Sequence, residues 1–210
     1  MKETMEPVIV EGRKLALNWW GKAWNTNLES YADYSNRIAR GRSYVRDGAV
    51  IDLKISPGKV LAKVQGSRAR PYTVDIDIVE LSDARKADIV QRCAGKIEDL
   101  DSLISGRISK TVENIFLERD GLFPSPSEII FHCSCPDKAY MCKHVAAVLY
   151  GIGVRFDNDP LLFFSLRGLD VSTLIRRSVD DRLSKMLSNA DVRSDRAISD
   201  DRIKGLFGSL

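Results

Sequence analysis

The chain has 210 residues, of which 44% are hydrophobic and 29% are charged, a composition typical of a folded globular protein. This length suits one compact domain or two small ones. The formal net charge is only +3, which excludes a polybasic protein that binds nucleic acid through its total charge alone.

The first 80 residues are predicted to form an α+β region. Trp20 and Trp24 lie four residues apart, and Leu28 continues the stripe, so the pattern predicts a helix within 15–34 that anchors in the core. Four short strands in an antiparallel meander are expected to follow, over 43–46, 49–55, 60–64 and 72–79. Asp47-Gly48 stands between the first two apolar runs, which is typical of a β-hairpin.

Positive charge is concentrated in this β region. From Arg37 to Arg70 there are nine Lys or Arg residues and two acidic ones, a local net charge of +7. On a strand, Arg42, Tyr44 and Arg46 would project from one face, which suits phosphate contacts and base stacking. The alternative is a solvated sheet face whose arginines pair with Asp75 and Asp77. The candidate nucleic-acid-binding residues are Arg37, Arg40, Arg42, Tyr44, Arg46, Arg68 and Arg70.

Residues 81–122 are predicted to be helical. Ser82 is a suitable N-cap for a helix over 85–104, whose apolar stripe includes Cys93. We expect Cys93 to be a buried apolar residue. A second helix is expected over 110–119.

The segment 131–145 contains three cysteines and one histidine that form a complete set of zinc ligands: Cys133, Cys135, Cys142 and His144. In a strand, residues two apart share a face, so Cys133 and Cys135 would point the same way. Cys142 is expected just before a short helix over 145–150 that Gly151 ends, with His144 in its first turn. His132 is a rival ligand, but on a strand it faces away from Cys133.

We interpret the site as structural zinc. Catalytic zinc keeps three protein ligands and an open position, whereas four candidates fill the shell here. No His-x-Glu pair of the zinc-deaminase type precedes the cysteines. The alternatives are unliganded thiols or a disulfide. A Cys-x-Cys disulfide is strained, and the sequence has no secretory signal, so we expect a reducing, cytoplasmic environment and a metal.

The pattern Cys-x-Cys-x6-Cys-x-His resembles the SWIM zinc finger, a module found with Swi/Snf-type ATPases and Mu-type transposases. The match includes Cys-Pro-Asp at 135–137 and Met-Cys-Lys-His-Val-Ala-Ala-Val-Leu-Tyr-Gly at 141–151. Segments at 19–24, 40–42, 64–68 and 166–169 are similar to bacterial and archaeal SWIM zinc-finger proteins. The resemblance implies zinc binding, a role in binding DNA or protein, and a Swi/Snf-type helicase as partner.

The expected fold class is α+β. It comprises an N-terminal antiparallel β-meander with helices over 1–80, a helical connector over 81–122, and a small ββα-like SWIM zinc finger with its following helix over 123–170. Residues 171–210 are expected to form a helical or flexible C-terminal tail, with a helix from 172 to 176 and a polar stretch over 188–204.

We therefore predict a zinc-binding, non-catalytic protein that recognises DNA, with one structural Zn²⁺. The competing prediction is a protein-interaction adaptor, in which the finger or the tail binds a partner and DNA is not contacted. A third class, an enzyme with catalytic zinc, requires that one of the four ligands be absent from the metal. The apolar runs are shorter than a membrane span, and the phosphate-loop and dinucleotide-binding motifs are missing, so neither a membrane nor a small-molecule substrate is expected.

Overall fold

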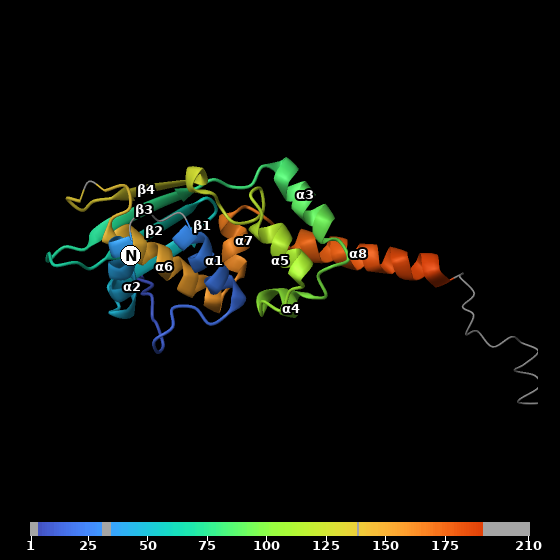
Figure 1. The fold of residues 1–210 in the computed structure, drawn as a ribbon, viewed down its shortest axis with the longest axis horizontal. Helices are drawn as coiled ribbons and strands as arrows, with labels where there is room; N and C mark the ends of the chain where they lie inside the picture. Colours follow the sequence, from blue (N-terminus) through green and yellow to red (C-terminus); the bar gives the residue numbers. More distant parts are fainter. Residues whose placement is uncertain (1–3, 31–34, 138, 191–210) are drawn as a thin grey trace, which may run out of the picture.

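The computed structural model describes residues 4–30, 35–137 and 139–190. Within them lie eight α-helices, one short 3-10 helix (η1) and four strands (Figure 1). Their order along the chain is α1 (Trp19–Ser30), α2 (Ser35–Arg46), β1 (Val50–Ser56), β2 (Lys59–Val64), β3 (Tyr72–Ile78), α3 (Asp83–Cys93), α4 (Leu100–Ile104), α5 (Lys110–Leu117), η1 (Pro126–Glu128), β4 (Ile129–Cys133), α6 (Lys143–Asn158), α7 (Leu161–Leu166) and α8 (Val171–Ala190).

The four strands form one antiparallel sheet in the order β1-β2-β3-β4. On β3 the side chains alternate strictly, with Val74 and Ile76 buried and Thr73 and Asp77 exposed, because one face of the sheet covers the core. The last strand, β4, comes from a distant part of the sequence and aligns Cys133 with Val74. The mixed α/β composition and the antiparallel sheet confirm the expected α+β class.

Helix α6 is the centre of the molecule. It contacts all four strands as well as α1, α2 and α7, and its residues from His144 to Val154 are buried (Figure 1). The expectation that this helix ends at Gly151 was wrong. A Cβ atom at Gly151 would lie 2.9 Å from Leu53 Cδ1, and one at Gly153 would lie 2.6 Å from Asn25 Oδ1. These glycines let β1 and α1 approach the helix closely, so they serve packing and do not end it.

The expected aromatic anchor of α1 is confirmed. Trp20 and Trp24 are almost completely buried, at 0% and 1% exposure. Each indole N–H donates a hydrogen bond to a backbone carbonyl, Trp20 to Leu103 and Trp24 to Leu149, both at 2.8 Å. A buried indole requires such a partner, and these two bonds tie α1 to α4 and α6.

The opposite end of the molecule is helical, and α8 extends from it (Figure 1). Ser82 caps α3 as expected, accepting a hydrogen bond from Arg85 N. The single helix expected over 85–104 is instead two helices, α3 and α4, because the chain turns at Gly95, whose φ is +66°. The helix expected at 172–176 continues to Ala190. The remainder of the expected tail, 191–210, lies outside the described residues.

The strand expected over 43–46 was wrong, because these residues are the last turn of α2. Asp47-Gly48 ends this helix instead of turning a hairpin. Gly48 has φ +68° and donates to Val45 O at 3.1 Å, while Ala49 N donates to Tyr44 O at 2.9 Å. These two bonds form a Schellman motif. Arg42, Tyr44 and Arg46 therefore lie on a helix and do not share a strand face.

Among the described residues, none of the helices combines the length and the apolar character that crossing a bilayer requires.

Candidate metal centre and basic surface

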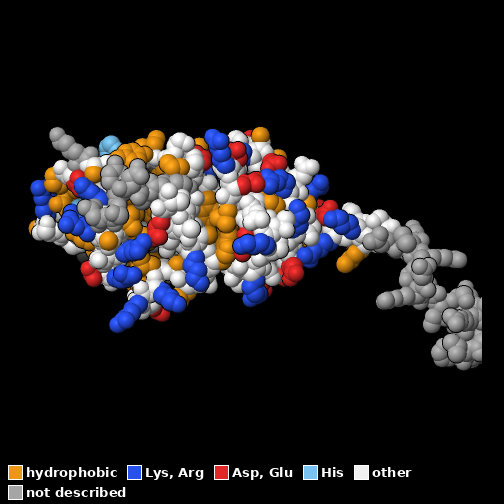
Figure 2. All heavy atoms as spheres, viewed as in Figure 1, with side chains coloured by type: hydrophobic (Ala, Val, Ile, Leu, Met, Phe, Trp, Pro, Cys, Tyr) orange, Lys and Arg blue, Asp and Glu red, His pale blue; other side chains and the backbone are white. Residues whose placement is uncertain are grey.

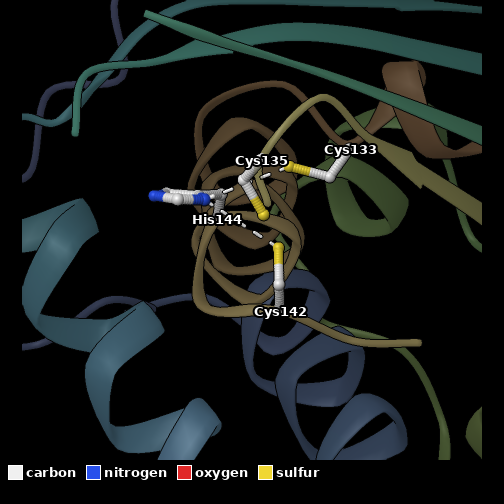
Figure 3. Close-up of side chains that lie close together, drawn as sticks. All are labelled: Cys133, Cys135, Cys142 and His144. Carbon is white, nitrogen blue, oxygen red and sulfur yellow. Dashed lines mark hydrogen bonds between the residues drawn. The ribbon is translucent and has the colours of Figure 1, made fainter. Parts of the chain in front are cut away.

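The side chains of Cys133, Cys135, Cys142 and His144 converge on one point beneath the edge of the sheet (Figure 3). Their ligand atoms all lie within 4.8 Å of one another. His144 Nδ1 is 4.0 Å from the sulfur of Cys133 and 3.9 Å from that of Cys142. Within the described part of the chain, this is the cluster of metal-ligating side chains close enough to hold an ion.

The ligands come from the end of strand β4 and from the start of helix α6. Cys133 ends β4, and Cys135 follows it after Ser134, whose N–H donates to Thr73 O at 3.0 Å and extends the pairing with β3. Cys142 is the N-cap of α6 and accepts a hydrogen bond from Val145 N at 3.5 Å. His144 lies in the first turn of the same helix. The expected arrangement of strand end, loop and helix start is confirmed.

The position of Cys142 favours its thiolate. Its sulfur accepts a hydrogen bond from the Cys133 thiol, and this contact, with those from His144 and Val145 N–H, outweighs burial and lowers the pKa of Cys142. The same contact with Cys142, together with burial, raises the pKa of Cys133. The N-terminal end of a helix adds a favourable field for negative charge. One thiolate is thus ready for a metal, and a cation would replace the proton on Cys133.

Two tyrosines hold the imidazole of His144. The Tyr72 ring lies 4.4 Å from it at an angle of 30°, and the Tyr44 ring meets it edge-on at 5.5 Å. This packing turns Nδ1 toward the sulfurs. Gly66 closes the pocket, because a Cβ atom there would lie 2.6 Å from the Tyr72 ring and 3.3 Å from His144 Nε2. Any larger residue at this position would displace the histidine or the tyrosine.

The donor set fits zinc. Zinc–sulfur bonds of about 2.3 Å and zinc–nitrogen bonds of about 2.0 Å in a tetrahedron place the ligand atoms about 3.5–3.8 Å apart. The separations of 3.9 and 4.0 Å from His144 Nδ1 exceed these values by a few tenths of an ångström, so the four side chains surround a space of about the size that the ion needs. The four side chains are consistent with one structural Zn²⁺, which would join the sheet to the central helix. The three cysteines form no disulfide.

The rival ligand, His132, lies outside the cluster. It is exposed and pairs with Asp75 across β3 and β4, on the face of the sheet opposite to Cys133. Alternation along the strand explains the difference.

The predicted nucleic-acid-binding residues lie on two elements, α2 and the loop between β2 and β3. Figure 2 shows Lys and Arg side chains over the N-terminal segment and α2, and others over the helical end of the molecule. Arg40, Arg42 and Arg46 lie on α2, while Arg68 and Arg70 are exposed on the loop between β2 and β3. Tyr44 is half-buried against His144. Both elements adjoin His144, through Tyr44 and Tyr72.

Three of these arginines are engaged within the protein, and Arg46 donates from Nε to Arg13 O at 3.3 Å. Arg37 forms an ion pair with Asp137, which lies in the loop between the two ligand pairs. Arg42 donates to Glu29 at 2.6 Å and to the Tyr150 hydroxyl at 2.8 Å. The alternative, in which arginines pair with Asp75 and Asp77, was wrong in its partner, because Lys59 bridges both carboxylates, each at 3.1 Å.

Sequence reasoning missed three basic residues beside α2. Arg13, Lys14 and Lys22 line a hollow together with Arg42 and Arg46. The charge-rich region 37–70 does not include Arg13, Lys14 and Lys22. These three residues meet Arg42 and Arg46 only because segment 13–16 packs against α1 and α2. The spacing of Lys22, Thr26 and Glu29, which share one face of a helix, is the signal that could have indicated this hollow.

Comparison with known proteins agrees with the metal centre. Residues 132–151 match the family model of the SWIM zinc finger. The chain is 37% identical over 163 residues to the uncharacterized protein Rv2102 of Mycobacterium tuberculosis. This match covers 77% of the chain but 58% of that relative, so the chain spans little more than half of the relative's length. No solved structure gives a significant match.

Proposed function

We propose that this protein is a zinc-dependent, non-catalytic DNA-binding protein that acts in the cytoplasm together with a Swi/Snf-type helicase. The observation that supports the proposal is the excess of basic side chains on α2 and on the loop between β2 and β3. Tyr44 on α2 and Tyr72 after the loop 65–71 both contact His144, so the two elements that carry the arginines are anchored at the metal site. Arginine side chains suit phosphate contact.

The ligand set favours a non-catalytic role. Four protein side chains complete a tetrahedral zinc shell, which leaves no position for water or a substrate. Three thiolates also reduce the Lewis acidity of the ion. The zinc would therefore fix the position of α6 and of the helix α2 packed on it, and the recognition surface would be built on this frame.

The helicase partner is inferred from the resemblance to SWIM proteins that occur with Swi/Snf-type ATPases. Co-purification of the full chain with a Swi/Snf-type helicase from the same cell tests this part. The expected result is a complex that survives nuclease treatment, because protein contacts and not shared DNA hold it together. Loss of the helicase after nuclease treatment would reject a direct partnership.

The DNA-binding part is tested by fluorescence anisotropy with a short labelled duplex at increasing salt. Binding through several basic side chains should weaken steeply, with a slope of log affinity against log salt of about −0.9 for each phosphate contacted. Arg68→Ala with Arg70→Ala should reduce both the affinity and the slope. Lack of binding by the wild-type protein at low salt would reject DNA recognition.

A second candidate function, a protein-interaction adaptor, is favoured by a different observation. Helix α8 exposes a stripe of apolar side chains at Val179, Leu183, Met186 and Leu187, with exposures from 51% to 70%. Their spacing of three and four residues places them on one side of the helix. If the protein binds the helicase but not DNA, and Leu183→Ser with Leu187→Ser abolishes the complex, the adaptor function is the correct one.

A further inference from the structure

A hollow of about 350 Å³ lies between the N-terminal segment 13–16, α1, α2 and Tyr150 of α6. Five of its lining residues are basic and one is acidic: Arg13, Lys14, Lys22, Arg42, Arg46 and Glu29. We call it the α1–α2 hollow.

The α1–α2 hollow has an uncompensated positive charge. Its one carboxylate, Glu29, is already engaged by the Arg42 guanidinium at 2.6 Å and by the Tyr150 hydroxyl at 2.5 Å. Among the described residues, Arg13, Lys14, Lys22 and Arg46 form no salt bridge with a carboxylate. Like charges gathered at one place repel one another, and an anion bound between them would relieve this repulsion.

Two of the three guanidinium groups of the hollow, those of Arg42 and Arg46, are held in place before any ligand arrives. Arg42 donates from Nε to the Tyr150 hydroxyl at 2.8 Å and lies over the Tyr150 ring, 5.4 Å from its centroid. Arg46 donates from Nε to Arg13 O at 3.3 Å, which ties the N-terminal segment to α2. A fixed guanidinium loses little conformational entropy on binding, so the hollow is prepared for an anion.

The shape of the hollow indicates a polymeric ligand. It is open to solvent, and the side chains of Arg13, Lys14, Lys22 and Arg46 are exposed around it. A small metabolite is normally enclosed over most of its surface, whereas a nucleic-acid backbone passes across an open basic groove. Thr26 and Asn25 add neutral polar groups between the cations.

We propose that the α1–α2 hollow binds backbone phosphates of DNA and extends the basic surface from α2 onto the N-terminal segment and α1. This inference rests on the proposed DNA-binding function and assigns phosphate contacts to Arg13, Lys14 and Lys22, which lie outside the charge-rich region 37–70.

The test compares single charge deletions at different places. Lys14→Ala and Lys22→Ala remove one positive charge each from the hollow, and Lys185→Ala removes one from the exposed part of α8. All three have the same net charge, so they separate a local contact from the overall field. Circular dichroism of each variant checks that the fold is retained.

Affinity for a short fluorescent DNA duplex is measured by anisotropy between about 50 and about 200 mM salt. Each hollow variant should bind more weakly than Lys185→Ala and should reduce the salt slope by about one unit. Between about 50 and about 200 mM salt, the affinity of each hollow variant should therefore fall by a factor about three times smaller than the factor by which the wild-type affinity falls. If the wild-type protein binds DNA but the hollow variants show the same affinity and salt slope as Lys185→Ala, the inference is overturned and the DNA-binding function remains.

A second measurement covers the case in which the wild-type protein does not bind DNA. Inorganic phosphate, compared with sodium chloride at equal ionic strength, should raise the melting temperature of the wild-type protein but not of the variant with both Lys14→Ala and Lys22→Ala. That result supports an anion site in the hollow even if the proposed function fails. Equal melting temperatures in both salts would overturn the site itself.

Discussion

Gly41 on α2 faces Ala146 on α6 so closely that a Cβ atom at position 41 would lie only 2.6 Å from the Cβ of Ala146. A Cβ there would also lie 2.8 Å from the Ala146 carbonyl carbon, which is backbone and cannot rotate away. The absence of a side chain at Gly41 thus sets the distance between the helix that carries the arginines and the helix that carries two zinc ligands.

Replacing Gly41 by Val should force α2 away from α6. Overpacking of this kind costs about 1–3 kcal/mol, more than the gain of up to about 1 kcal/mol from the better helix propensity of a non-glycine residue. Urea unfolding, followed by the fluorescence of Trp20 and Trp24, measures the change in the free energy of unfolding. Ala39→Val, at an exposed position of the same helix, is the control and should cost less than about 1 kcal/mol. Equal losses in both variants would contradict the close contact.

Zinc ligation should stabilise the whole fold and not the finger alone. Protein purified without added zinc should contain about one equivalent of the metal, and Cys135→Ser or His144→Ala should lose it. Because zinc binds the folded chain, its removal should lower the free energy of unfolding by about 4 kcal/mol when free zinc exceeds the dissociation constant about a thousandfold. Cys93→Ala should keep the metal. Normal zinc content in both ligand variants would refute the site.

Alkylation by iodoacetamide should separate the four cysteines into two classes. Cys93 is completely buried, and burial raises its pKa to about 12, so it should react only when the chain unfolds. Cys133 and Cys135, which are half-buried, should be protected while zinc is bound and should react after a chelator is added, whereas Cys142, at 1% exposure, should stay unmodified like Cys93. Mass spectrometry should then show two modified cysteines in the native chelated protein. Modification of Cys93 before unfolding would contradict its position in the core.

Glu128 should contribute a pH-dependent part of the stability. Burial favours its protonated form, but hydrogen bonds from Ser125 N–H, Arg167 and Arg85 prevail and lower its pKa to about 2. A depressed carboxyl pKa means that the stabilisation is complete above the unfolded value of about 4.5 and is lost as the pH falls toward about 2.

The variant Glu128→Gln isolates this contribution. At pH 7 it should be less stable than the wild type by about 3 kcal/mol, because Arg167 is 0% exposed and would lose its carboxylate partner. The difference should shrink as the pH is lowered from about 4.5, since the wild-type carboxyl is then protonated as well. Chemical unfolding at several pH values measures it. A difference that does not depend on pH would exclude the charge of Glu128 as its cause.

The zinc site could be predicted from the sequence because its information is local. Within twelve residues, spacing alone placed Cys142 at the N-cap and His144 in the first turn of α6, and the structure confirms both. The packing of Tyr44 and Tyr72 on His144 could not be predicted, since these residues come from elements far apart in the sequence.

The sheet shows a different limit. Asp47-Gly48 was interpreted as a hairpin turn, but a glycine with positive φ serves a helix end equally well, and only the hydrogen bonds of Ala49 and Gly48 distinguish the two. The sheet was therefore expected to begin with a strand at 43–46, and the strand that ends at Cys133 was assigned to the finger and not to this sheet. Pairing of β4 with β3 joins residues more than fifty positions apart, which no local pattern reveals.

Because the ligands come from both β4 and α6, a bound metal would link the sheet to the central helix inside the domain. An appended finger could lose its ion and leave the rest of the protein undisturbed. Here the metal would fix the first turn of α6. Helix α2, which carries the arginines, packs on that same turn through Gly41 and Tyr44. The supply of zinc would thus affect the position of α2 and its arginines, although none of these arginines is a zinc ligand. Loss of the metal would displace the basic side chains without changing any of them.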